Sequence, residues 1–221
     1  MKKIFLVGMV VLALCFAGCG DDNSDSGGSG ILPAKPNGNA GVSVNAAGDL
    51  VINAPLYYID YDEEGIIDGS YPVKTVDLSL NETVHAFINF TPTGVTGTIS
   101  GGMFSITIPA PSASLLIPII DNPDLPITFI KSGAGTKTGF LWLYTTSMGI
   151  IQLFANPPSL DKLYTFTYAD GSATISGANT EMISDLSVAK GWNSILISEN
   201  TIIEQVSANP TTNAKWIFFD H

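Results

Sequence analysis

Residues 77–90 read DLSLNETVHAFINF, and apolar side chains recur at nearly every second position of this stretch. Successive side chains of a β-strand point to opposite faces, so this period of two predicts a half-buried strand. The face expected to be buried carries Leu78, Leu80, Val84, Ala86, Ile88 and Phe90.

The same period of two continues through most of residues 41–221, whereas helical periodicity is almost absent. Gly101-Gly102 and Asp170-Gly171 interrupt alternating stretches and are typical of hairpin turns. The sequence therefore predicts an all-β fold for a single domain spanning residues 41–221. We expect an antiparallel β-sandwich or barrel of about nine to eleven short strands.

The first 18 residues have the character of an export signal. A basic start, Met1-Lys2-Lys3, precedes an apolar run over residues 4–16, and the apolar character ends at Gly18. A membrane-spanning helix needs roughly 20 apolar residues. We therefore interpret residues 1–18 as a signal peptide.

The motif Phe16-Ala17-Gly18-Cys19 resembles the lipobox of bacterial lipoproteins, in which small residues precede a cysteine that receives the lipid. This resemblance implies that a fatty acid such as palmitate on Cys19 attaches the protein to the membrane of the cell envelope. Gly20, rather than Asp, follows the cysteine. In this class of proteins that choice implies delivery to the outer membrane of a diderm host.

Residues 19–40 are rich in Gly, Ser, Asn, Asp and Pro, which predicts a disordered tether after the lipidated cysteine. Residues 97–109 and 186–193 are similar to passages in β-rich modules of uncharacterised bacterial lipoproteins. That second resemblance implies no activity.

Composition excludes several classes of function. The formal net charge is −11, and all nine basic residues are lysines. Two of them lie in the signal peptide, which leaves seven against 20 acidic residues. Such a surface repels phosphate backbones, so we expect no nucleic-acid partner. With Cys15 removed and Cys19 lipidated, no thiol remains for a disulfide or a metal.

Catalytic motifs are scarce. His85 and His221 are the two histidines, and neither a G-x-S-x-G elbow nor an H-E-x-x-H motif is present. We therefore expect a non-enzymatic binding or structural module. The alternative is a secreted glycan-active hydrolase that uses paired carboxylates about 5 to 10 Å apart.

The acidic stretch IDYDEEGIIDG at residues 59–69 is compatible with a weak calcium loop or with a solvated acidic turn. Gly65 stands at the position where a calcium loop turns sharply, but Tyr71 replaces the bidentate Glu expected at position twelve. A helix-loop-helix site is therefore excluded. The oxygen ligands of a strand-flanked calcium loop would come from Asp60, Asp62, Glu64, the Ile66 carbonyl and Asp68.

Two alternating aromatic stripes could form stacking platforms for a ligand if they face outward. The alternative is that each belongs to a strand that is buried on both faces. A glycan, an apolar small molecule or a protein would suit such a platform. The stripes are Phe140, Trp142 and Tyr144 in one stretch, and Tyr164, Phe166 and Tyr168 in the other.

Overall fold

A computed structural model describes residues 33–60, 72–118, 130–132, 135–157, 159–178, 182–199 and 203–220. The regular secondary structure of this part of the chain is almost entirely β-strand, which confirms the all-β prediction. Its helical elements are two short 3-10 turns, η2 (Asn39–Gly41) and η3 (Ala113–Leu115). No described helix has the length and hydropathy needed to cross a bilayer.

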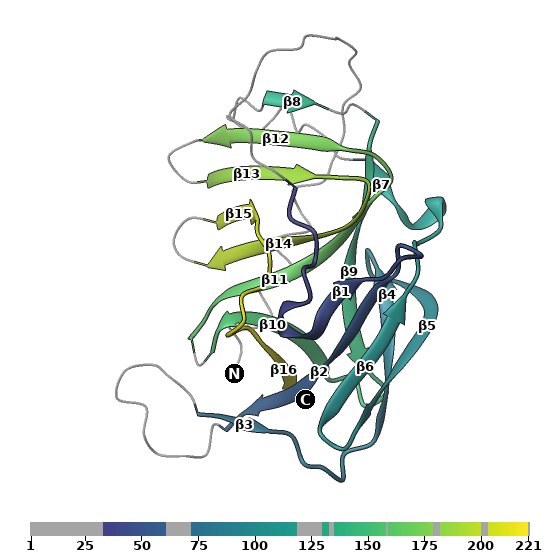
Figure 1. The fold of residues 1–221 in the computed structure, drawn as a ribbon, viewed down its shortest axis with the longest axis vertical. Helices are drawn as coiled ribbons and strands as arrows, with labels where there is room; N and C mark the ends of the chain where they lie inside the picture. The colour runs from purple at the N-terminus through teal and green to yellow at the C-terminus, as the bar shows by residue number, and fades with distance from the viewer. Residues whose placement is uncertain are drawn as a thin grey trace.

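Eight strands form a closed barrel. In the order β9–β4–β5–β6–β2–β16–β10–β11 each strand pairs with the next, and β11 pairs back onto β9 to close the ring. Figure 1 shows this ring in the lower part of the view, with a stack of further strands above it. The bounds are β2 (Leu50–Ile59), β4 (Glu82–Ile88), β5 (Thr91–Ser100), β6 (Met103–Ile108), β9 (Lys137–Thr145), β10 (Ile150–Asn156), β11 (Ser159–Ala169) and β16 (Lys215–Phe219).

The interior of the barrel is filled by alternate side chains of its strands, as the period of two predicted. Large side chains with at most 1% exposure include Leu50, Leu56, Phe104, Ile108 and Leu153. Closure pairs the strand edges with one another, which removes the open edges that an incomplete sheet would present.

The strand β11 belongs to two sheets at once. One edge pairs with β10 and, further along, with β9, while the other edge pairs with β14 over residues 162–169. From β14 a side sheet continues through β15, β13, β12 and β8. These strands are β8 (Ile130–Ser132), β12 (Ala173–Ala178), β13 (Met182–Val188), β14 (Gly191–Glu199) and β15 (Ile203–Ser207).

Three more short strands pair with the barrel: β1 (Val42–Val44) and β3 (Val73–Thr75) with β2, and β7 (Ile117–Pro118) with β9. These short strands account for much of the difference between the sixteen strands of the described chain and the predicted nine to eleven. Among the described strands two pairings, β2 with β16 and β13 with β15, are parallel, and the other pairings between them are antiparallel as expected.

The predicted strand over residues 77–90 is shorter than expected. Residues 77–80 form a turn, in which the Asp77 carboxylate accepts hydrogen bonds from the backbone N–H and hydroxyl of Ser79, and Leu78 is 71% exposed. These two bonds lower the pKa of Asp77. At the other end, Asn89 and Phe90 adopt positive φ angles of 48° and 62° and turn the chain into β5. Phe90 is therefore exposed instead of buried.

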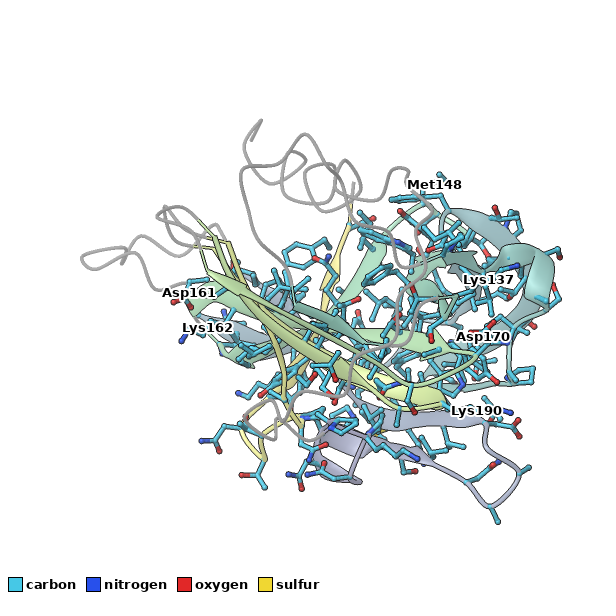
Figure 2. All side chains as sticks on the ribbon, turned by 90° about the horizontal axis from the view of Figure 1, so that it is seen from above. Lys137, Met148, Asp161, Lys162, Asp170 and Lys190 are labelled. Carbon is cyan, nitrogen blue, oxygen red and sulfur yellow. The ribbon has the colours of Figure 1, made fainter. Side chains whose placement is uncertain are left out.

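The Gly101-Gly102 turn joins the paired strands β5 and β6, as predicted. The hairpin predicted at Asp170-Gly171 is wrong, because β11 and β12 do not pair. The Asp170 carboxylate accepts a hydrogen bond from the backbone N–H of Lys137 at 2.7 Å, which ties the turn to the start of β9. Figure 2 shows Lys137 and Asp170 at one side of the molecule, with Asp161 and Lys162 of β11 at the other.

The predicted tether ends earlier than residue 40. Residues 33–41, here called the N-terminal strap, pack on the folded domain and cross β14 (Figure 1). Ala34 is buried, and its carbonyl accepts a hydrogen bond from the backbone N–H of Ser194. The Asn39 side chain donates to the Pro210 carbonyl at 2.9 Å. The strap is therefore part of the domain.

Candidate functional site

The aromatic side chains of β9 lie on the outer face of the barrel. Leu141 and Leu143 point into the core and are 7% and 3% exposed, so the alternating residues face outward. Phe140 packs against a second apolar cluster on the side sheet, whereas Trp142 and Tyr144 lie beside β4. All three are half-buried.

Two phenylalanines complete this surface, and together the four rings form the outer aromatic cluster: Phe87, Phe90, Trp142 and Tyr144. Phe87 pairs across the strands with Trp142 and meets the Tyr144 ring edge-on, with centroids 5.2 Å apart. Phe90 stacks on Trp142 with a centroid separation of 4.6 Å and an interplanar angle of 26°. Phe90 is 41% exposed, so one ring of the stack is open to solvent.

Sequence reasoning missed both phenylalanines. Phe87 alternates with the inward residues Ala86 and Ile88, so it shares the outward face of the strand with Thr83 and His85. This alternation was the signal that could have placed Phe87 on the surface. Phe90 was expected inside because the strand was assumed to continue through Asn89. Asparagine tolerates positive φ better than most residues, and this property is the local signal for the turn.

Asn89 positions the exposed ring. Its side-chain amide donates to the Leu115 carbonyl at 2.8 Å, and its side-chain oxygen accepts from the backbone N–H of Phe140 at 3.0 Å. The backbone N–H of Asn89 donates to the Phe140 carbonyl. The turn is thus fastened to β9 by two hydrogen bonds and to η3 by a third. This support holds Phe90 in a left-handed conformation that is uncommon for a bulky residue.

The outer aromatic cluster contains no charged side chain. A tyrosine phenol is neutral at physiological pH, and burial raises the pKa of Tyr144 further. The Trp142 indole nitrogen is covered and has no hydrogen-bond partner among the described residues. The cluster can therefore offer flat, uncharged ring faces, which suit stacking against a ring or another apolar plane.

The second stripe is not a surface platform, and here the alternative of a strand buried on both faces is correct. Tyr164 and Phe166 are 4% and 3% exposed and lie in the barrel core, where Phe166 stacks on Trp216 at 5.9 Å. Tyr168 is half-buried and meets Trp192 edge-on at 5.5 Å. Thr167, on the opposite face of β11, is also buried.

Of the five predicted calcium ligands, Asp60 alone lies in the described chain. The Asp60 carboxylate accepts a hydrogen bond from the Lys74 ammonium at 2.7 Å, which forms an ion pair. The other ligands of the predicted calcium site, Asp62, Glu64, Ile66 and Asp68, lie outside the described residues, as does Cys19. The described residues contain no group of three or more metal-binding side chains. Calcium binding by this loop stays a prediction.

Several described carboxylates and one histidine support turns and strand ends. Glu82 accepts hydrogen bonds from the hydroxyl and backbone N–H of Ser147 in the turn after β9. His85 lies 3.4 Å from the Thr146 hydroxyl, measured from its Nε2 atom. The lowered pKa of Asp77 is opposite to the shift that a glycosidase general acid requires.

No known protein family, curated protein or solved structure matches this chain. Function must therefore be inferred from its own surfaces. Two of the residues predicted to bind a ligand, Trp142 and Tyr144, lie beside two further rings on an outward face. Two others, Tyr164 and Phe166, are buried in the core.

Proposed function

We propose that this protein is a lipid-anchored, non-enzymatic binding module of the cell envelope, and that its outer aromatic cluster holds a glycan. The observation that carries the proposal is the stacked pair of Phe90 and Trp142, whose outer ring is exposed. Sugar rings have flat faces of C–H groups that can lie on aromatic planes, whereas their hydroxyls remain in water. The uncharged cluster suits such a neutral ligand.

The cost of holding Phe90 outward supports a role in binding. A bulky residue with positive φ is strained, and a phenylalanine that is 41% exposed gains less from burial than a core residue does. Asn or Gly would close the same turn with less strain. The ring at this position is therefore better explained by a contact with a ligand than by the stability of the fold.

Glycan binding is tested with Phe90→Asn, which removes the ring while keeping a residue suited to the turn. We expect the affinity for a retained polysaccharide to fall roughly tenfold, the lower end of what loss of one stacking contact costs. The melting temperature should change little, because relief of the strained φ offsets the loss of stacking on Trp142. The measurement is affinity electrophoresis in gels that contain β-glucan, xylan or dextran, with thermal melts of the same proteins.

The matched control is Met148→Asn. Met148 also has a positive φ, of 71°, is 64% exposed, and lies in the turn at the other end of β9 (Figure 2). This variant should be retarded like the wild type. If no polysaccharide retards the wild type, or if Phe90→Asn migrates as the wild type does, glycan binding by the cluster is refuted.

Membrane anchoring is tested with Cys19→Ala in the full-length precursor. The resemblance to a lipobox predicts that this variant loses labelling by radioactive palmitate and moves from the membrane to the soluble fraction. Cys15→Ala serves as the control and should still be labelled. Membrane association of Cys19→Ala equal to that of the wild type would contradict lipidation at this residue.

A further inference from the structure

A groove of about 500 Å³ lies between the N-terminal strap and the start of β16. Its walls include Ala40 of the strap, Tyr57 of β2, and Thr212, Asn213, Lys215 and Trp216. Small-molecule sites commonly have volumes of about 300 to 1,000 Å³. The groove lies at β2 and β16 of the ring, away from the outer aromatic cluster on β4 and β9. Around the ring, β6 and β5 lie between the groove and β4, and β10 and β11 lie between the groove and β9.

The groove carries a single kind of charge. Lys215 is the only charged side chain among the described residues of its lining. The Lys215 ammonium lies 4.9 Å from the centre of the Tyr57 ring, so the ring holds the cation without neutralising it. No described carboxylate forms an ion pair with Lys215. The chain has a net charge of −11, so a groove whose described charge is positive differs from the acidic character of the chain as a whole.

The walls of the groove are held in place before any ligand arrives. The Trp216 indole N–H donates to the Ala40 carbonyl at 3.0 Å, which fixes the strap against β16. The backbone N–H of Ala214 donates to the Thr211 carbonyl, which closes the turn that carries Thr212 and Asn213. Gly41 allows the close approach of the strap, because a Cβ there would lie 2.2 Å from the Asn53 carbonyl oxygen. A rigid site loses less entropy when it binds.

From these features we infer that the groove binds a small organic carboxylate with a body about the size of one sugar ring. The carboxylate would pair with the Lys215 ammonium, and the amide of Asn213 and the hydroxyl of Thr212 supply neutral hydrogen-bonding groups beside it. The Tyr57 ring and the alanines of the wall provide apolar contact for the body. This site is independent of the outer aromatic cluster and of the glycan proposed for it.

The inference is tested by titrating the protein with two carboxylates, glucuronate and phenylacetate, and with glucose as the uncharged match to glucuronate. Backbone amide shifts of residues 212–217 in NMR spectra report on the groove. We expect at least one carboxylate to shift these amides saturably, more weakly at high salt because the cation is partly exposed. Glucose should produce no such shifts.

The variant Lys215→Gln keeps most of the side-chain length and removes the charge. It should weaken carboxylate binding at least about tenfold, as expected for loss of a charged hydrogen bond. The matched control is Lys190→Gln, which removes an exposed lysine in the turn between β13 and β14 (Figure 2) and should bind as the wild type does. Any one of three results would overturn the inference. The first is a spectrum that neither carboxylate changes at concentrations up to about 50 mM, near the weakest affinity of interest. The other two are equal shifts with glucose and equal affinity of Lys215→Gln. None of these results bears on the polysaccharide retardation assay.

Discussion

Replacement of Trp192 by alanine is expected to lower the free energy of unfolding by about 4 kcal/mol, within the range for loss of a buried tryptophan. Trp192 is 1% exposed and packs in the core where β14 joins β11, with the Tyr168 ring against it. Its indole nitrogen has no hydrogen-bond partner in the described chain. The loss therefore comes from packing and from the cavity left behind.

Urea denaturation followed by circular dichroism measures this effect. Trp192→Phe should cost less than alanine, because most of the ring volume remains and no hydrogen bond is broken. Leu78→Ala, at a side chain that is 71% exposed, should change the stability by less than about 0.5 kcal/mol. A loss below about 1 kcal/mol for Trp192→Ala would contradict its central place in the core.

Replacement of Gly97 by valine is expected to destabilise the barrel by about 3 kcal/mol or more, at the upper end of the cost of overpacking. A Cβ at Gly97 would lie 2.3 Å from the Ser105 carbonyl oxygen and 2.5 Å from the Ile106 Cβ. Both belong to β6, so the backbones of β5 and β6 would have to separate. Glycine permits this close approach within a strand.

The same denaturation experiment tests Gly97→Val, with Gly101→Asn as the control. Gly101 has a φ of 58°, which asparagine tolerates, and no atom within 4 Å of an added Cβ. This control should therefore lie within about 1 kcal/mol of the wild type. If Gly97→Val is as stable as Gly101→Asn, β5 and β6 do not pack as closely as described.

The class of fold could be predicted from the sequence because the period of two is a local property. Val84, Ala86 and Ile88 alternate with outward residues, and the structure buries all three. Closure of the ring could not be predicted, since it depends on contacts between distant segments such as Thr167 with Phe140. The Asp170-Gly171 turn illustrates the difference. Its local signal was correct for a turn, but β12 pairs with β13 and β8 instead of folding back onto β11.

The candidate site could be predicted only in part. Alternation placed Trp142 and Tyr144 on one face, and the inward Leu141 and Leu143 make that face the outer one. The same pattern in β11 gave no way to choose between an exposed stripe and a core, because that strand is covered on both sides. The groove at Lys215 left no local signal, since its walls come from four separate parts of the chain.

The parallel pairing of β16 with β2 has a consequence for folding during synthesis. β16 lies between β2 and β10, so the ring stays open along one full strand until residue 219 has been made. Until then β2 and β10 present unpaired backbone edges, which attract other chains. Contacts this distant in sequence also slow the final folding step. A chain that ends before β16 should therefore keep both edges open and be prone to aggregation.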